Sequence, residues 1–392
     1  MNTAYIVSAV RTPLGSFGGA LKGFTAVELG SLAIKGGLGK FNSDLRVDEV
    51  FMGNVCSANL GQAPARQASI GAGISNTVPC TTINKVCSSG MKSIMFAAQS
   101  IMLGQQDVIV AGGMESMSNI PFYLPSMRWG HKFGQGQVVD GLQKDGLVDA
   151  YDHKAMGMSG DATANKYGIS REAQDEYAVS SYRRAAAATE GGKFKNEIIP
   201  VSIPQRRGED IIMSEDEEYK NVRFDKIANL RPAFNKDGTV TAANASTLND
   251  GASALLVVSE NALKQYDLTP LARIVAFADA AHEPEWFTTA PTKAAPIALK
   301  RAGLSKNDID YYEVNEAFSV VAMAFAKECE VSYDKMNVNG GAVSLGHPLG
   351  CSGARIVTTL LHTLDDKAAK YGLATLCNGG GGASALILEN LS

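Results

Sequence analysis

The chain has 392 residues, of which 45% are hydrophobic and 19% charged, with a formal net charge of −4. It is long enough for two or three domains, and its slightly acidic balance excludes a nucleic-acid-binding surface. No apolar run reaches the roughly 18 residues of a membrane helix, and the six cysteines form no Cys-x-x-Cys pair, so neither a zinc site nor a redox motif is indicated. Scattered cysteines and a first segment without a targeting pattern predict a cytoplasmic protein.

In chain order, the first predicted strand lies in MNTAYIVSAV, and the segment 80–99 is the first with a candidate catalytic group. It begins with β-branched residues that favour a strand, passes through a turn, and has helical apolar spacing from Met91 onward. Cys87 therefore lies where a helix begins, and free N–H groups and the helix dipole favour a nucleophilic thiolate there. Its position alone also fits a small buried cysteine with no reactive role.

The stretch 118–248 differs in composition from the chain around it. It opens with a loop rich in Pro, Gly and aromatic residues, followed by a predicted helix with Ser170 as N-cap and a stop at Gly191 and Gly192. A charged region then follows, and six cations within it fit either a solvated surface or a phosphate contact. They are Arg206, Arg207, Lys220, Arg223, Lys226 and Arg231.

Three glycine-rich segments near the C-terminus carry polar groups suited to catalysis: VNEAF at 314–318, NGGAVSLGHPLGCSGAR at 339–355 and CNGGGG at 377–382. His347 lies between Gly346 and Pro348, which predicts a tight loop where a neutral imidazole could take a proton from a thiol. Cys377 could act as an acid or base, and the glycines after it could present N–H groups to an oxyanion. Asn315 could hold a water, or simply cap the next helix.

Short internal repeats predict a duplicated chain. GASAL occurs at 251–255 and again at 382–386, while CSSG at 87–90 resembles CSG at 351–353. Early pairs lie about 265 residues apart and the last pair lies 131 apart, so the first half contains an insertion. Alternating strands and helices within each half predict mainly parallel sheets covered by helices, with ligands bound near the join.

Six motifs, in order, resemble those of the thiolase family along the whole chain: INKVCSSGMKS, VAGGMESMS, TLNDGASA, VNEAF, NGGAVSLGHPLGCSGAR and LCNGGGG. The resemblance implies an α/β fold of two αβ halves in a five-layer αβαβα arrangement, with a loop domain inserted in the first half. The expected division is 1–117 plus 249–270 for the first half, 118–248 for the coenzyme A-binding and tetramerisation insertion, and 271–392 for the second half.

Within that family, the chain is most similar to the short-chain acetyl-CoA C-acetyltransferases. The implied reaction condenses two acetyl-CoA to acetoacetyl-CoA and free coenzyme A, or runs in reverse, with ping-pong kinetics through an acetyl-cysteine. Cys87 matches the nucleophile, His347 its activating base, and Cys377 the acid or base at the second substrate's α-carbon. Asn315 matches the residue that holds an oxyanion-hole water, and the N–H groups of Cys87 and Gly379 match a second oxyanion hole.

The resemblance also implies ligand contacts, and no tightly bound cofactor. Arg223 and Lys226 match a cationic patch near the coenzyme A nucleotide. The chain departs from the family at Ala155, where members often have a histidine that contacts the pantetheine; His153 is a candidate substitute. Positions matching the pantetheine tunnel are Leu147, Met156, Ala242, Ser246, Ala317 and Phe318. Positions matching a potassium site are Tyr182, Ala242, Ala243, Ala245 and Val343.

Four other functions compete with this interpretation. A broader 3-ketoacyl-CoA thiolase of fatty-acid degradation would share every motif. A ketoacyl synthase would have His or Asn in place of Cys377. A cysteine peptidase using Cys87, Asn315 and His347 would explain neither Cys377 nor the insertion, and a non-catalytic acyl-CoA binder would not need all four polar groups.

Overall fold

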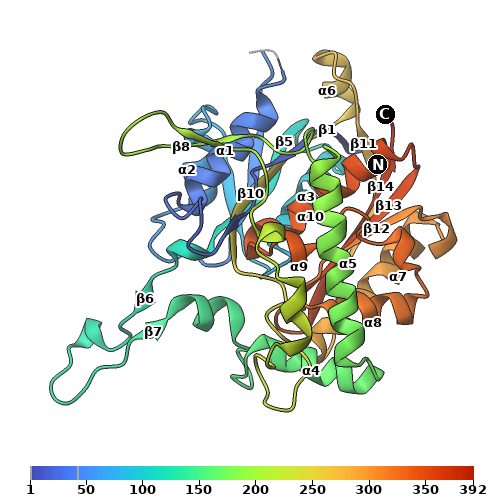
Figure 1. The fold of residues 1–392 in the computed structure, drawn as a ribbon. Coiled ribbons are helices and arrows are strands. Elements are labelled where there is room, and N and C mark those ends of the chain that lie inside the picture. Colours follow the sequence, from blue (N-terminus) through green and yellow to red (C-terminus); the bar gives the residue numbers. More distant parts are fainter. Residues whose placement is uncertain (1, 42–43) are drawn as a thin grey trace.

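The computed structural model describes residues 2–41 and 44–392, and its central feature is one large mixed sheet (Figure 1). The main path of the sheet has the strand order β12-β13-β14-β11-β1-β10-β5-β3-β4, and β2 (Gly15–Ser16) pairs with β10. The other strands of this sheet are β1 (Tyr5–Arg11), β3 (Glu49–Gly53), β4 (Cys80–Ile83), β5 (Val108–Ser116), β10 (Asn249–Val258), β11 (Ala272–Ala281), β12 (Tyr311–Val314), β13 (Tyr371–Asn378) and β14 (Gly382–Asn390).

The two ends of this sheet repeat one topology. In the N-terminal half, β1 and β5 run antiparallel to β10, whereas β3 runs parallel to both β5 and β4. In the C-terminal half, β11 and β13 run antiparallel to β14, and β12 runs parallel to β13. A parallel bridge between Tyr312 and Met336 takes the place that β4 has in the first half. The predicted duplication is therefore confirmed, with the two GASAL segments in β10 and β14. The prediction of mainly parallel sheets is wrong, because β10 and β14 each run antiparallel to the strands on both sides.

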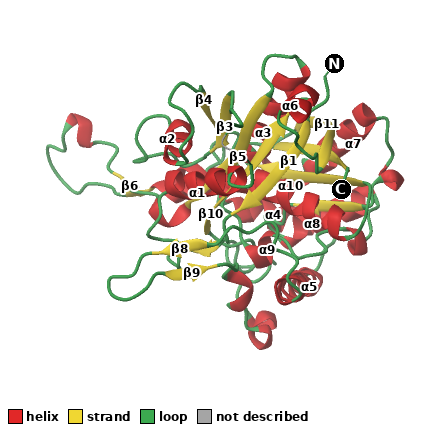
Figure 2. Ribbon diagram, turned by 90° about the horizontal axis from the view of Figure 1, so that it is seen from above, coloured by secondary structure: helices red, strands yellow, loops and turns green. Residues whose placement is uncertain are grey.

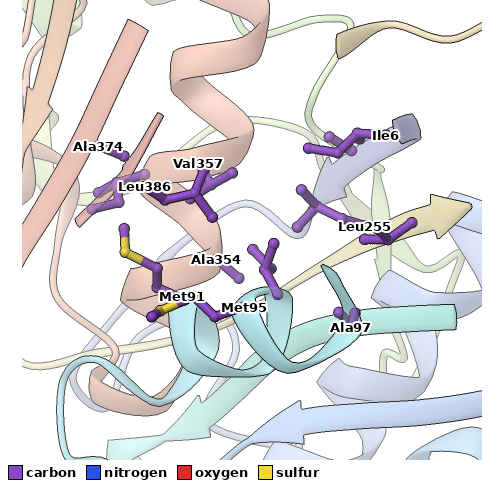
Figure 3. Close-up of a cluster of buried hydrophobic side chains, with 14 of the residues drawn as sticks. Ile6, Met91, Met95, Ala97, Leu255, Ala354, Val357, Ala374 and Leu386 are labelled. Carbon is purple, nitrogen blue, oxygen red and sulfur yellow. The ribbon is translucent and has the colours of Figure 1, made fainter. Parts of the chain in front are cut away.

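Helices form three layers around the two halves of the sheet. The central layer contains α3 (Ser89–Met102) and α10 (Leu349–Asp366), which pack against each other and against strands of both halves. Figure 3 shows side chains of α3 beside those of α10. The outer layers are α1 (Ala26–Leu38) with α2 (Pro64–Gly71) on the N-terminal half, and α7 (Pro291–Ala302) with α8 (Ser319–Cys329) on the C-terminal half. The predicted five-layer αβαβα fold is confirmed.

Strand alternation assigns each buried side chain to one layer. Leu255 of β10 and Leu386 of β14 belong to the central hydrophobic cluster around α3 and α10. Their neighbours Leu256 and Ile387 belong instead to the outer clusters beneath α1 and α7. This is the two-residue period expected of strands covered on both faces.

The two halves are joined edge to edge, which the sequence did not predict. Tyr5 pairs with Arg273 and Ile6 pairs with Ala272, both antiparallel, and these two pairs make the sheet continuous. This contact could not be predicted from the sequence, because it consists of only two residue pairs. The two strands that form it are already paired within their own halves.

The insertion supplies α4 (Met156–Tyr167), α5 (Arg171–Glu190) and two hairpins, β6 (Phe122–Tyr123) with β7 (Val139–Asp140) and β8 (Val201–Ile203) with β9 (Ile211–Met213). The hydroxyl of Ser170 accepts the N–H of Ala173, and Gly191 caps the other end of α5, as predicted. In both views the segment containing β6 extends away from the sheet (Figures 1 and 2). The boundaries at 118, 249 and 271 stay a prediction.

The remaining helical segments are short. None of the helices within residues 2–41 and 44–392 combines the length and apolar composition needed to cross a membrane. The short helices are α6 (Glu260–Gln265) and α9 (Ala342–Leu345), with further helical segments of three to six residues at Met117–Asn119, Met127–Trp129, Gln143–Leu147, Glu218–Lys220, Phe224–Asn229, Pro284–Thr289, Lys306–Asp308 and Tyr333–Lys335.

Candidate active site

Cys87 lies in the tight connection between β4 and α3, as the sequence predicted. The preceding Val86 has a φ of +49°, a left-handed conformation that a β-branched residue rarely adopts. The hydroxyl of Ser89 accepts the N–H of Lys85 at 2.8 Å and donates to the carbonyl of Val86 at 2.5 Å. These bonds hold the turn that places Cys87 immediately before the helix.

The loop that follows β13 meets the Cys87 loop. The hydroxyl of Ser88 donates to the side-chain oxygen of Asn378 at 3.0 Å, so the residues next to Cys87 and Cys377 are bonded across the two halves. The N–H of Gly379 lowers the pKa of Cys87, and Cys87 in turn raises the pKa of Cys377. The two sulfurs, distant in the sequence, therefore lie in one region.

Both thiols are protonated at rest, which corrects the expectation of a thiolate at Cys87. Burial raises the pKa of Cys87 to about 12 and outweighs the N–H groups of Gly379 and Cys87, which lower it. Burial, with the charge of Cys87, raises the pKa of Cys377 far above its usual range. A buried thiol in this state needs a base in order to react.

His347 lies in a loop, as predicted, between α9 and α10. Gly346 has a φ of +116°, and the His347 N–H donates to the side-chain oxygen of Asn249 at 2.9 Å. The ring nitrogen Nδ1 is 2.6 Å from the hydroxyl of Ser352, which itself donates to the Pro348 carbonyl at 2.8 Å. Because that hydroxyl has a single proton, Nδ1 carries the imidazole proton and donates it to Ser352.

The other ring nitrogen of His347 is left as a base. Nε2 is buried and has no hydrogen-bond partner among the described residues. Burial, assisted by the nearby Arg355, lowers the pKa of His347 to about 3, so the ring is neutral at physiological pH. A neutral imidazole with a free Nε2 is the form that can accept a thiol proton.

Asn315 is a buried amide with no partner for its side chain. It follows β12 and is only 1% exposed, yet neither Oδ1 nor Nδ2 has a hydrogen-bond partner among the described residues. The alternative role as a helix cap is excluded, because Phe318 is the N-cap of α8 and no side chain caps it. A buried amide of this kind is normally explained by a ligand or an ordered water.

Five of the six predicted tunnel residues fall into two places near these groups, and the sixth, Ala242, lines a separate cavity. Met156, Ala317 and Phe318 pack in one cluster with Cys377, and the Ser246 N–H donates to the Ala317 carbonyl at 3.0 Å. Leu147 instead packs against the cluster that contains Cys87. Gly379 lies between them, since a side-chain carbon there would be 3.4 Å from Met156 and 3.6 Å from Val86.

A separate surface cavity of about 280 Å³ collects the predicted cationic and potassium-site residues. Arg223 and Lys226 line it, which supports a ligand contact for these two of the six cations. Its wall also contains Tyr182, Ala242 and Ala243. Val343 packs against Tyr182, whereas Ala245 belongs to the cluster around Cys377.

The departure from the family motif lies at the start of α4. Ala155 is the N-cap of this helix and provides no side-chain cap. His153 is exposed, with a φ of +59°, and its N–H donates to the Asp149 carbonyl at 3.1 Å. No contact links its ring to the clusters described above, so its suggested part in pantetheine binding stays a prediction.

The sequence reasoning missed two residues beside the reacting groups. Ser352 fixes the His347 tautomer, and Glu115 is a fully buried carboxyl whose charge acts on Cys87. A signal for Glu115 was present in the sequence, because it is the one acid in the apolar run VIVAGGMES. Ser352 gives no such signal, since serine is common in the first turn of helices.

Comparison with known proteins assigns the family. The models "Thiolase, N-terminal domain" and "Thiolase, C-terminal domain" match residues 4–261 and 268–390. A cytosolic acetyl-CoA acetyltransferase of Gibberella zeae is 54% identical over 99% of this chain and 98% of its own. A mitochondrial acetyl-CoA acetyltransferase of Homo sapiens is also 54% identical, over 98% of this chain and 90% of its own.

A solved structure agrees with these matches. The Acat5 thiolase of Ascaris suum in complex with coenzyme A is 46% identical and superimposes with a TM-score of 0.94, covering 99% of this chain and 100% of that one. The relatives differ in compartment, so the cytoplasmic location expected from the sequence stays a prediction. The matches over both halves of the chain show that it belongs to the thiolase family and is an acyltransferase.

Proposed function

We propose that this enzyme is an acetyl-CoA C-acetyltransferase, which condenses two acetyl-CoA to acetoacetyl-CoA and free coenzyme A and also catalyses the reverse thiolysis. The names of relatives at 54% identity support the choice of substrate. The bond between Ser88 and Asn378 is the observation that carries the mechanism, because it joins the loops of the two cysteines.

In the first half-reaction, Cys87 becomes acetylated. Nε2 of His347 takes the thiol proton while the sulfur attacks the thioester carbonyl, and the coenzyme A thiolate leaves with that proton. Burial disfavours the thiolate and the imidazolium separately, so the proton passes during the attack rather than before it. The N–H groups of Cys87 and Gly379 are the proposed donors to the developing oxyanion.

In the second half-reaction, the Cys377 thiol passes its proton to Nε2 of His347, and the resulting thiolate removes the α-proton of a second acetyl-CoA. The enolate oxygen is stabilised by Nε2 of His347, now protonated, and by a water held on the free amide of Asn315. The enolate carbon attacks the acetyl carbonyl and the carbon–carbon bond forms. The Cys87 thiolate leaves and regains its proton from Nε2 of His347, while Cys377 keeps the α-proton as a thiol. Because free coenzyme A departs before the second substrate reacts, ping-pong kinetics follow.

The substrate arm follows the residues already described. The pantetheine would pass Leu147, Met156, Ser246, Ala317 and Phe318 to reach the sulfurs. Arg223 and Lys226, with Ala242 beside them, would lie near the nucleotide, where cations suit phosphate groups.

The acetyl-enzyme gives a direct test. Mixing the protein with acetyl-CoA and no second substrate should add one acetyl group, seen by intact mass spectrometry and mapped to Cys87. The adduct should be absent from Cys87→Ser, and an adduct that persists in this variant rejects the assignment. Comparing turnover of acetoacetyl-CoA with longer 3-ketoacyl-CoAs separates this function from a broader fatty-acid thiolase, which would prefer the longer chains.

Two further properties belong to this proposal. A potassium ion would bind among Tyr182, Ala242, Ala243, Ala245 and Val343, because no described residue donates a hydrogen bond to the carbonyls of the three alanines. Exchanging KCl for NaCl at fixed ionic strength should lower the rate, and equal rates would end the idea. The protein would also be a homotetramer, held together through the projecting β6–β7 hairpin.

A further inference from the structure

Glu115 is a completely buried carboxyl near the end of β5, with both oxygens fully occupied by donors. Oε1 accepts the side-chain amide of Asn54 at 2.9 Å and the N–H of Cys56 at 3.2 Å. Oε2 accepts the N–H of Val55 at 3.0 Å and the N–H of Gly350 at 2.9 Å. An ionised carboxylate has acceptor sites for all four of these hydrogen bonds and needs no proton of its own to form them.

The four donors belong to both halves of the molecule. Asn54, Val55 and Cys56 follow β3 in the N-terminal half, whereas Gly350 lies in the first turn of α10, three residues after His347. An N–H in a first helical turn has no partner within its own helix, so Glu115 supplies the acceptor that Gly350 lacks. One side chain thus fixes the start of α10 against the loop after β3.

Close backbone packing makes this contact possible. A side-chain carbon on Gly350 would lie 2.7 Å from the Met114 carbonyl and 2.8 Å from the α-carbon of Asn54. Only glycine allows the helix start to approach β5 so closely. The position of the His347 loop therefore depends on a contact made at Gly350, a few residues along the chain.

The charge of Glu115 also reaches the nucleophile. It raises the pKa of Cys87, of Cys56 and of Cys351. Other charged groups act here as well: Asp145 and Cys87 raise the pKa of Cys56, and Arg355 lowers that of Cys351. Burial raises the pKa of Glu115 to about 7, while its four donors lower it. Glu115 thus combines a mechanical contact to the His347 loop with an electrostatic effect on Cys87.

We propose that Glu115 is a positioning residue for acyl transfer, which holds the His347 loop of the C-terminal half in register with Cys87 of the N-terminal half. The inference rests on the roles of Cys87 and His347 given under the proposed function. Glu115 touches neither substrate nor the reacting sulfur, and acts through Gly350 and through its charge.

Glu115→Gln is the matched test, because glutamine keeps the size and loses one acceptor. The donors come in two pairs, Asn54 with Cys56 on one oxygen and Val55 with Gly350 on the other. The NH₂ group of glutamine would face one of these pairs, and both donors of that pair would lose their acceptor. We expect single-turnover acetylation of Cys87 by acetyl-CoA to slow at least tenfold, with little change in KM. The pH of half-maximal alkylation of Cys87 by iodoacetamide should fall, because the neighbouring negative charge is gone.

Asp250→Asn controls for the general loss of a buried carboxylate. Asp250 accepts the N–H of Ser118 at 2.9 Å, its hydroxyl at 2.6 Å and the hydroxyl of Ser116 at 3.3 Å. Among the described residues it forms no hydrogen bond with α10. This variant should acetylate at nearly the wild-type rate with an unchanged alkylation midpoint. If acetylation slows equally in both variants and the pH midpoint of Cys87 alkylation does not shift in Glu115→Gln, then Glu115 has only a structural role and the inference is overturned.

Two outcomes separate this inference from the proposed function. If wild type and Glu115→Gln are acetylated equally fast, the proposed role of Glu115 is overturned and the proposed function is unaffected. Wild type that forms no acetyl-Cys87 overturns the proposed function, and this inference with it. If Glu115→Gln does not fold, Asn54→Ala, which removes one of the four donors, should slow acetylation by a smaller factor, and a wild-type rate there overturns the inference.

Discussion

At the scale of single residues, backbone strain lies directly beside the nucleophile. Val86 has a positive φ, a conformation that costs on the order of 1–3 kcal/mol for a residue of its type. Lys85 in this turn is bonded to the C-terminal half, since its ammonium lies 2.7 Å from the carboxylate of Asp279 and 2.8 Å from the hydroxyl of Ser384. The contacts of one half thus maintain the strained loop of the other, and the loop exposes the Cys87 sulfur to Gly379.

Replacing Cys377 by serine should separate the two half-reactions. A serine hydroxyl is a far weaker acid than a thiol and cannot exchange the α-proton, whereas Cys87 and His347 are unchanged. We expect Cys377→Ser to form the acetyl-enzyme normally while condensation falls by about 10²–10⁴-fold, the usual contribution of a general acid or base. Mass spectrometry of the adduct and a steady-state condensation assay measure the two steps, and equal turnover would remove Cys377 from the mechanism.

Buried, neutral His347 should make the protein less stable in mild acid. Its pKa is about 3 when folded and near 6.5 when unfolded, so below pH 6.5 the unfolded chain binds a proton that the folded chain does not. The sign is therefore a loss of stability as pH falls, amounting to about 2 kcal/mol between pH 7 and pH 5. Urea unfolding of wild type and His347→Gln at both pH values measures it; an identical pH dependence in the two proteins would contradict the burial effect.

Residue-scale prediction worked where the local sequence carried the information. Cys87 was placed by its helix start and His347 by its flanking glycine and proline, and both lie as expected. The partnerless amide of Asn315 and the bonds of Glu115 could not be predicted, because they arise from packing between segments far apart in the chain. The resting thiol at Cys87 was mispredicted for the same reason, since burial is a property of the fold.

At the scale of elements, glycine contacts set how closely β5 and α10 approach. A side-chain carbon on Gly113 would lie 2.0 Å from the Gly350 carbonyl oxygen, a backbone atom that can move only with the whole helix start. We expect Gly113→Ala to lower the free energy of unfolding by about 3 kcal/mol or more, and to reduce activity because the His347 loop shifts.

The matched control is Gly136→Ala, since a side-chain carbon at Gly136 would meet nothing within 4 Å. Denaturant unfolding and turnover of both variants check the prediction. Wild-type stability in Gly113→Ala would mean that the helix start can withdraw from β5 at little cost, and would weaken the argument for a fixed His347 loop.

Elements with strong local patterns were predicted well. The helices α3 and α5 were expected from apolar spacing and from the Ser170 cap, and both occur. The edge contact between β1 and β11 was not expected, because it depends on how two finished halves meet. The small hairpins of the insertion were also missed, since their two- and three-residue strands are too short to show an alternation.

At the scale of the whole molecule, the duplication explains why the site lies where it does. Cys87 comes from the N-terminal half, whereas Asn315, His347 and Cys377 come from the C-terminal half. The equivalent helices α3 and α10 pack together in the central layer, which brings their N-terminal ends, and hence Cys87 and the His347 loop, to the same region. Neither half alone contains both Cys87, the proposed nucleophile, and His347, the proposed base.

The segment between β6 and β7 carries a set of exposed apolar side chains that the chain itself does not cover. Trp129 is 85% exposed and Phe133 is 98% exposed, on a hairpin that extends from the body (Figure 1). Clustered exposure of this kind is typical of a protein–protein interface and supports the proposed association through this hairpin. The other members of the cluster are Phe122, Leu124, Met127 and Val138.

A double substitution, Trp129→Asp with Phe133→Asp, should therefore convert a tetramer into dimers, because two desolvated carboxylates cannot be buried in an apolar contact. Light scattering during size-exclusion chromatography measures the mass directly. Leu103→Asp, at a side chain that is 71% exposed just after α3, is the control and should leave the mass unchanged. Acetylation of Cys87 should persist in the double variant, since the hairpin contributes no residue to the candidate active site; a tetramer that survives the substitution would place the association surface elsewhere.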